Sequence, residues 1–297
     1  MNNTTYKHVS SGNVHLELVQ GNLPLLTIQN EHATCSLFLY GAHVSSFKPK
    51  DASELLFLSP WSRFEKGQPI RGGIPLCFPW FGSHPDRKDL PLHGVVRTQM
   101  WELVETTDMP DGSTTVVLKT HDDEATRAVW PYRFSLQLIL NISRYLTLSL
   151  RVLNTDIYTF HFEEAFHTYL WVEDPASCQV EGLDGLVMLD RLQDDYTSLH
   201  EGPVKVYGEF VRVYNNAGSL VTLVDPKKSR RILLKQENLR HVVVWNPGVR
   251  AAMENPEVMD SWKSFLCVEH ANCLDASVVL HPGETHHSTL KISSIPL

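Results

Sequence analysis

Two stretches of the 297-residue chain carry side chains that could transfer protons. In the first, the apolar residues 265–268 end in Glu269. A carboxyl group buried beside aromatic residues has a raised pKa, which suits a general base near neutral pH. If Glu269 lies at a sheet edge instead, it is merely a solvated acid. The sequence supports the two interpretations equally.

The second stretch is residues 161–170, which alternate as a β-strand would. Alternation places a mostly titratable set of side chains on one face: His161, Glu163, Ala165, His167 and Tyr169. A strand inside a large protein rarely presents such a face unless it lines a cleft or meets solvent. A functional cleft and a solvent-exposed edge both fit this pattern.

Residues 71–82 predict a rigid loop that could bind a ligand. Two prolines exclude a central strand, and three glycines allow the backbone to approach a ligand closely. Arg71 offers a planar fork of donors to a phosphate or carboxylate. Trp80, Phe78 and Phe81 could stack on the apolar face of a sugar ring. The alternative is a loop that fills the core, with Arg71 in a structural ion pair.

A weaker signal lies in residues 92–97. His93 and Arg97 stand four residues apart on either side of Gly94. Both could face a ligand, but two ordinary surface residues would give the same pattern.

The 15 histidines form no recognisable metal motif. The sequence contains no His-Glu-x-x-His and no Cys-x-x-Cys, and the adjacent His286 and His287 would point to opposite faces of a strand. We therefore expect no metal site. The sequence also lacks the Gly-x-Ser-x-Gly and glycine-rich phosphate-loop motifs, which argues against serine hydrolases and nucleotide-dependent kinases.

The elements that must position these residues are mainly strands. Turn-forming residues are spaced too closely for a regular alternation of long helices. Only two short helices are expected, at residues 123–129 and at residues 256–263 after a capping Asn255. The pattern predicts an all-β antiparallel sandwich rather than a parallel α/β fold. The runs of β-branched and aromatic residues that predict strands are 34–40, 114–120, 134–140, 146–153, 220–224, 241–245 and 265–269.

The composition, with 42% hydrophobic and 20% charged residues, is that of a folded globular protein. No linker, repeat or charge block divides the chain, so we expect one domain over residues 1–297. The net charge of −8 argues against a nucleic-acid partner. The longest basic cluster, residues 227–231, is typical of a solvated turn that enters a strand.

The five cysteines are odd in number and form no close pair, as expected for reduced thiols. Cys77 has apolar neighbours that would raise its thiol pKa, which disfavours a role as nucleophile. Residues 1–8 lack the apolar core of a signal peptide, and no stretch has the ~20 apolar residues that span a bilayer. We therefore expect a cytoplasmic protein with no membrane partner.

Taken together and in chain order, these segments resemble the glucose-6-phosphate 1-epimerase family, the hexose-6-phosphate mutarotase branch of the aldose 1-epimerase superfamily. Each motif is modest, but the ordered set is specific and spans about residues 35–290. The matching segments are Gly41-Ala42-His43, Arg71-Gly72-Gly73-Ile74-Pro75, Pro79-Trp80-Phe81-Gly82, His93-Gly94 to Arg97, His167-Thr168-Tyr169, Trp245-Asn246-Pro247-Gly248 and Cys267-Val268-Glu269.

The resemblance implies a galactose-mutarotase-like supersandwich of large antiparallel sheets with a few short helices. It also implies an enzyme without a cofactor that interconverts the α and β anomers of a hexose 6-phosphate, glucose 6-phosphate above all. We expect a small sugar phosphate as its partner and a monomeric protein. By position in the family, the catalytic pair would be His167 and Glu269, the phosphate ligands Arg71 and Arg97, and the residue beside the sugar His93.

The chemistry explains these residue types. Opening a pyranose ring needs a base for the proton of the anomeric hydroxyl and an acid for the ring oxygen. Glu269 would be the base, and His167, protonated when substrate is bound, would be the acid. After rotation about the C1–C2 bond the roles reverse and the ring closes on its other face.

One position departs from the family pattern. The family usually presents an aspartate that holds sugar hydroxyls just before Arg212, and Val211 stands there in this chain. A valine accepts no hydrogen bond, so Glu209 or another acid compensates, the substrate differs, or activity is reduced. Two alternatives therefore stay open: a non-catalytic sugar-phosphate-binding or regulatory protein on the same scaffold, and a mutarotase of an unphosphorylated sugar.

Overall fold

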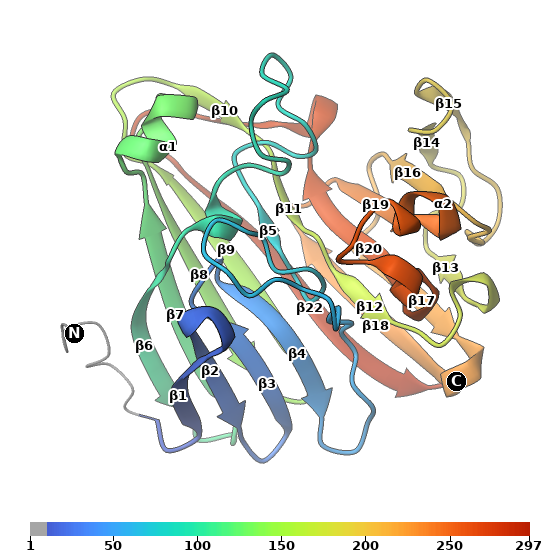
Figure 1. The fold of residues 1–297 in the computed structure, drawn as a ribbon, viewed down its shortest axis with the longest axis horizontal. Helices are drawn as coiled ribbons and strands as arrows, with labels where there is room; N and C mark the ends of the chain where they lie inside the picture. Colours follow the sequence, from blue (N-terminus) through green and yellow to red (C-terminus); the bar gives the residue numbers. More distant parts are fainter. Residues whose placement is uncertain (1–10) are drawn as a thin grey trace.

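The computed structural model describes residues 11–297, so the N-terminal residues that were searched for a signal peptide lie outside the described residues. The named strands pair antiparallel in two eight-stranded sheets, a four-stranded sheet and a two-stranded sheet (Figure 1). Among the described residues, the helices are few and short. The all-β antiparallel class predicted from the sequence is confirmed.

The first large sheet owes its strands to strict alternation. In β8 and β9 every second side chain, from Phe134 to Ile142 and from Leu146 to Asn154, is buried. The strand order in this sheet is β13 (Gln179–Glu181), β17 (Leu220–Asp225), β18 (Arg230–Glu237), β22 (Thr285–Pro296), β9 (Leu146–Asn154), β8 (Phe134–Ile142), β7 (Thr114–His121), β6 (Glu102–Asp108).

The second large sheet, called the site sheet below, carries the candidate catalytic residues. Its order is β15 (Tyr196–Leu199), β14 (Val187–Asp190), β16 (Phe210–Tyr214), β19 (His241–Asn246), β20 (Phe265–Asn272), β11 (Glu164–Phe166) and β5 (Leu76–Cys77), and β12 (Tyr169–Trp171) also pairs with β20. The smaller sheets contain β1 (Val14–Val19), β2 (Leu23–Gln29), β3 (Ala33–Phe38) and β4 (His43–Pro49), and β10 (Phe160–Phe162) with β21 (Val278–Leu280).

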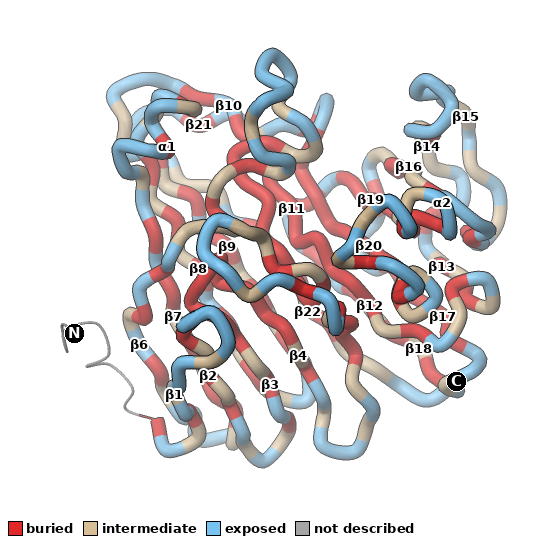
Figure 2. Tube along the Cα trace, in the orientation of Figure 1, coloured by how far each residue is buried: buried red, intermediate tan, exposed pale blue. Residues whose placement is uncertain are grey.

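The three larger sheets share a core. One continuous cluster of buried apolar side chains contains Leu26 of β2, Leu138 of β8 and Val268 of β20. Every residue of β20 is buried, as the red tube of this strand shows in Figure 2. Because side chains alternate along a strand, Leu266 and Val268 enter this core while Cys267 and Glu269 point to the opposite face.

The helix predictions are confirmed in one case and wrong in detail in the other. Helix α1 (Glu124–Val129) follows Asp123, whose side chain caps it. Residues 256–263 instead contain a turn held by Asn255 and then the 3-10 helix η5 (Met259–Ser264). Helix α2 (Gly248–Met253) was missed because its Asn-Pro-Gly start is typical of a turn. The other 3-10 helices are η1 (Gln20–Asn22), η2 (Val96–Thr98), η3 (Pro175–Ser177), η4 (Pro226–Lys228) and η6 (Leu274–Ala276).

The cysteines and the basic cluster follow the sequence-based predictions with one exception. All five cysteines are buried and free, and burial raises the pKa of the Cys77 thiol far above its usual range. Residues 226–228 form a turn before β18, as predicted. Arg230, however, is buried and paired with Asp225 at 3.2 Å, so this part of the cluster is not solvated. Across residues 11–297, no helix has the length and apolar character needed to cross a membrane.

Candidate active site

A cavity of about 890 Å³ opens on the face of the site sheet opposite the main core. Both candidate catalytic residues, His167 and Glu269, line it. Three of the four predicted substrate-binding residues also line it, namely Arg71, His93 and Trp80. The cavity therefore brings together side chains from segments that are up to 198 positions apart in the chain.

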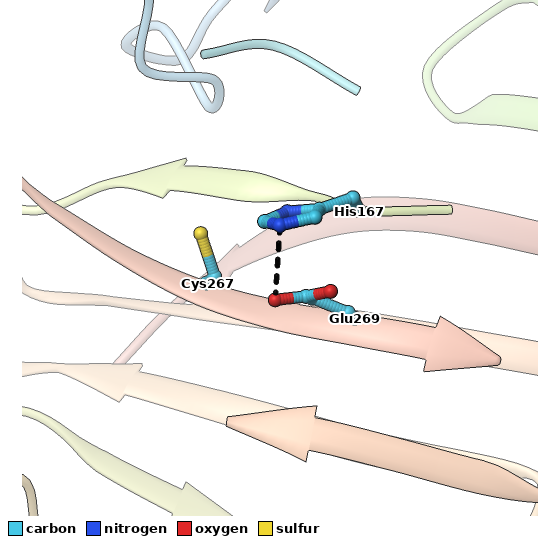
Figure 3. A group of neighbouring side chains, drawn as sticks. All are labelled: His167, Cys267 and Glu269. Atoms are coloured by element: carbon cyan, nitrogen blue, oxygen red, sulfur yellow. Dashed lines mark ion pairs between the residues drawn. The ribbon is translucent and has the colours of Figure 1, made fainter. Parts of the chain in front are cut away.

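The pairing of strands places His167 opposite Glu269. Ala165 of β11 pairs with Ala271 of β20, and Tyr169 of β12 pairs with Cys267 of β20. The same register therefore holds on both sides of the gap between β11 and β12. Position 167 in that gap thus faces position 269. The two side chains meet with His167 Nε2 3.4 Å from Glu269 Oε1 (Figure 3).

Burial favours the uncharged form of both members of this pair. The exposed fraction is 8% for the His167 side chain and 2% for the Glu269 side chain. Burial raises the pKa of Glu269 well above its usual range. Burial also lowers the pKa of His167 far below its usual value, and His93, Arg97 and Arg71 lower it further. These pKa shifts favour a carboxylic acid beside a neutral imidazole.

The pair retains polar atoms for a ligand. His167 Nδ1 and Glu269 Oε2 are buried and have no hydrogen-bond partner among the described residues. The His167 ring stacks on Tyr169, with ring centroids 4.9 Å apart and planes 9° from parallel. Trp245 meets both rings edge-on, at 5.8 Å from each. The aromatic walls hold the imidazole in one plane over the carboxyl group.

Arg71 combines the two roles considered from the sequence. Its Nη2 lies 3.6 Å from Glu257 Oε2, and its Nη1 donates to Tyr169 Oη at 3.4 Å. Both contacts are long, and Arg71 Nε is buried without a partner. The side chain is 21% exposed and lines the cavity. Arg71 is thus loosely paired and has donors left for an anion.

Arg97 is the one predicted site residue that is not among the side chains lining the cavity. It is only partly exposed, and it lies close enough to His167, His93 and Arg71 to act on all three electrostatically. Burial and the like charge of Arg71 lower the pKa of Arg97. No carboxylate within the described residues lies within 4 Å of its guanidinium. A second cation without a close acidic partner thus lies within electrostatic reach of His167, His93 and Arg71.

His93 is held in its neutral form with one nitrogen occupied. Its Nδ1 accepts a hydrogen bond from the Gly82 N–H at 3.1 Å, so the proton of the neutral ring lies on Nε2. Burial, Arg97 and Arg71 lower the pKa of His93 to about 3. The ring meets His167 edge-on at 5.1 Å. His93 can therefore offer an N–H donor beside the catalytic pair.

The aromatic residues of the 71–82 loop divide between the cavity and the core. Trp80 and Phe81 line the cavity, and Trp80 Nε1 donates to the Pro91 carbonyl at 3.0 Å. Phe78 is fully buried in the main core against Phe134. The expectation that Phe78 could stack on a sugar is therefore wrong, because its position in the loop points inward.

The titratable face predicted for residues 161–170 lies at the cavity. His161, Glu163, His167 and Tyr169 all line it. Both carboxylate oxygens of Glu163 already have partners, because they accept hydrogen bonds from the backbone N–H groups of Phe81 and Leu274 at 2.7 and 2.6 Å. It fixes two loops at the cavity rim.

Val211 also lines the cavity, whereas the side chain of Glu209 is exposed and does not. Glu209 is therefore not placed to compensate for Val211. Among the residues that line the cavity, the carboxylates are Glu163 and Glu269.

One group of side chains in the described part of the chain could hold a metal ion. The donor atoms of His167, Cys267 and Glu269 lie within 4.8 Å of one another (Figure 3). No sequence motif indicates this group, because Cys267-x-Glu269 and the distant His167 match none of the known metal-binding patterns. A cation bound there would occupy the same atoms that face each other for proton transfer.

Comparison with known proteins identifies the family. The family model described as aldose 1-epimerase matches residues 24–293. The chain belongs to the aldose 1-epimerase family. Membership of the aldose 1-epimerase family supports an enzyme that acts on the anomers of sugars.

Relatives and solved structures agree with this assignment. Proteins named "Putative glucose-6-phosphate 1-epimerase" share 33% identity in Cenchrus ciliaris (88% of this chain, 81% of the relative) and 30% in Escherichia coli K12 (89% and 88%). The crystal structure of a "putative mutarotase" from Salmonella typhimurium is 26% identical, with a TM-score of 0.90 over 98% of this chain and 96% of that one. A galactose mutarotase-like protein from Lactobacillus casei, 18% identical with a TM-score of 0.72 over 91% and 100%, shares the fold. The predicted supersandwich is confirmed.

Some residues of this aldose 1-epimerase site gave no signal in the sequence. Glu257 and Asn255 reach the cavity region from the segment after α2, where the sequence predicted only a helix and its capping residue. Val213 and Val243 line the cavity, but in the sequence they are β-branched residues typical of any strand. Only the pairing of β16, β19 and β20 places Val243 beside Glu269 and Val213 beside Val243.

Proposed function

We propose that this protein interconverts the α and β anomers of a hexose 6-phosphate, with glucose 6-phosphate as the best candidate. The observation that carries the proposal is the 3.4 Å contact between His167 Nε2 and Glu269 Oε1 in one cavity. Arg71 and Arg97 support the phosphate, because both lie within electrostatic reach of this pair. Two arginines with few acidic contacts favour a dianionic ligand.

In the proposed reaction the pair acts as one base and one acid. Glu269 removes the proton from the anomeric hydroxyl as the C1–O5 bond breaks and C1 becomes an aldehyde. His167 gives its proton to O5. Rotation about C1–C2 presents the other face of the aldehyde, and the reverse transfers close the ring. Each proton that leaves one atom is returned to another, so no co-reactant is consumed.

A bound phosphate would prepare the pair for these roles. The carboxylic acid with neutral imidazole and the carboxylate with imidazolium contain the same number of protons and differ only in where one of them lies. The positive charges of Arg97 and Arg71 disfavour the imidazolium. A phosphate dianion placed between them offsets those charges, which favours Glu269 as base and His167 as acid.

The test is anomer exchange by NMR or polarimetry on freshly dissolved α-glucose 6-phosphate. The protein should accelerate exchange over buffer, and Glu269→Gln should slow the catalysed rate by about 10² to 10⁴, the usual contribution of a positioned base. Glu209→Gln, an exposed acid outside the cavity, is the matched control and should keep full activity.

Three results would count against the proposal. An unchanged rate in Glu269→Gln removes the carboxyl group from the mechanism. Tight binding of glucose 6-phosphate by calorimetry with exchange at the buffer rate would identify a binding protein instead. Acceleration of free glucose alone would identify a mutarotase of unphosphorylated sugars.

A further inference from the structure

The cavity wall on one side of Glu269 is apolar. Val211 and Val213 of β16 and Val243 of β19 line the cavity, and we call these three residues the valine floor. Val213 pairs with Val243, which pairs in turn with Glu269. Side chains at paired positions share a face, and paired strands lie about 4.8 Å apart. The valine floor therefore begins one strand away from Glu269.

The wall on the other side of Glu269 is polar. His167 stands opposite Glu269 in the gap between β11 and β12, on the edge of β20 away from β19. Tyr169 follows on the same face, and Arg71 donates to its hydroxyl. The cation that would hold a phosphate is thus on the His167 side, and the valine floor is on the opposite side.

This asymmetry orients a pyranose ring. The proposed reaction places O1 at Glu269 and O5 at His167. The phosphate, joined through C6 and C5 to O5, then extends to the Arg71 side. C1 is bonded to O5 on one side and to C2 on the other, so C2 and its substituent project toward Val243 and Val213.

We infer that the substrate's 2-hydroxyl faces the valine floor and is not recognised by a hydrogen bond, so the protein accepts hexose 6-phosphates that lack this hydroxyl. The inference rests on the proposed function and deepens it. A site that hydrogen-bonds a substrate hydroxyl rejects the deoxy analogue by about 10⁴ to 10⁵, because its own polar groups lose their partner. The valine floor has no polar side-chain atom to lose.

Two charged side chains that line the cavity, Arg191 and Glu163, are already engaged. Arg191 lies next to Val211, because its backbone N–H donates to the Val211 carbonyl. The Arg191 guanidinium is paired with Asp195 at 2.9 Å. Across the cavity, both oxygens of Glu163 accept backbone N–H groups. Binding a sugar without a 2-hydroxyl therefore leaves neither Arg191 nor Glu163 without a partner.

The first experiment uses the wild-type protein and compares glucose 6-phosphate with 2-deoxyglucose 6-phosphate. The quantity compared is the catalysed rate divided by the buffer rate for each sugar, since the deoxy sugar has its own spontaneous rate. We expect the two accelerations to agree within about tenfold. A larger loss with the deoxy sugar overturns the inference and leaves the proposed function standing. No acceleration of either sugar overturns both.

The second experiment adds a hydroxyl to the floor. Val243→Thr keeps the side-chain volume and puts a hydrogen-bonding group next to C2, so it should shift the preference toward glucose 6-phosphate by about threefold or more. Val187→Thr, exposed on β14 of the same sheet and absent from the cavity wall, should leave the preference unchanged. A folded Val243→Thr protein with unchanged preference contradicts the inference. If that variant does not fold, Val213→Thr tests the neighbouring position.

Discussion

The chemistry of single residues here depends on shared burial. His167 and Glu269 are each shifted toward the uncharged form, in opposite pKa directions, by removal from water. At 3.4 Å their contact is longer than a charge-assisted hydrogen bond. In the proposed reaction the arginines would matter twice, because they would attract the phosphate and because their charges lower the pKa of the imidazole.

The role of Arg97 gives a prediction at this scale. Arg97→Gln removes a cation without a close acidic partner, so KM for glucose 6-phosphate should rise by about 10- to 100-fold, the loss expected for a hydrogen bond to a charged group. The rate with free glucose should not fall, because that sugar has no phosphate to lose a partner. Steady-state exchange NMR on both sugars measures the two effects. Arg231→Gln, an ion-paired residue on β18, is the control. An equal loss with both sugars would show that Arg97 acts on the structure and not on phosphate.

Two loops at the cavity are fixed to one another by backbone contacts. Phe78 forms a parallel bridge with Gly94, and the Val95 N–H donates to the Phe78 carbonyl at 2.9 Å. The His93 N–H in turn donates to the Gly82 carbonyl at 2.7 Å. These contacts join the loop that carries Arg71 and Trp80 to the loop that carries His93. The positions of the side chains predicted to bind substrate thus depend on the close approach of these two backbone segments.

Glycine substitutions test this junction. A Cβ on Gly94 would lie 1.9 Å from the Phe78 carbonyl oxygen, and its φ is +78°. Gly94→Ala should therefore lower the free energy of unfolding by about 2 to 5 kcal/mol, from the left-handed backbone and the overpacking together. Gly82 has a φ of +72° and open space around its Cβ position, so Gly82→Ala should cost only the backbone part, about 1 to 2 kcal/mol. Urea unfolding measures both, and equal losses would contradict the packing argument.

At the scale of the whole molecule, one core supports all three larger sheets and encloses several histidines. Burial and Arg97 lower the pKa of His43 to about 3, and burial lowers that of His270 to about 3. Each stays neutral in the folded chain and is protonated in the unfolded chain below its ordinary pKa of about 6.5. The unfolded state then binds more protons, so the folded state loses stability as the pH falls from about 6.5 toward 3.

His43 allows a test of this acid sensitivity. Above pH 6.5 its contribution is complete, and below that pH it should destabilise the fold by up to about 1.4 kcal/mol per pH unit. His43→Gln removes the titrating group, so its free energy of unfolding should fall less steeply between pH 6 and pH 4 than that of the wild type. Urea unfolding at a series of pH values gives both slopes. Parallel slopes would mean that His43 does not remain neutral in the folded protein.

The sequence by itself determined the strands and the residue types of the chemistry. Alternation in residues 134–140 and 146–153 appears as β8 and β9 because a period of two is a local property of the chain. The same alternation placed His161, Glu163, His167 and Tyr169 on a common face, which lines the cavity. A single domain, a monomer and a cytoplasmic location stay predictions.

Tertiary structure decided everything that depends on which distant strands pair. The register of β20 with β19 and with β11 and β12 sets Glu269 between Val243 and His167, although these residues come from three separate parts of the sequence. Pairing also decided that Phe78 enters the core while Trp80 faces the cavity, and that Glu257 meets Arg71. Hydrogen bonds between strands join residues irrespective of their separation in the chain, so no local pattern of amino acids could have specified these contacts.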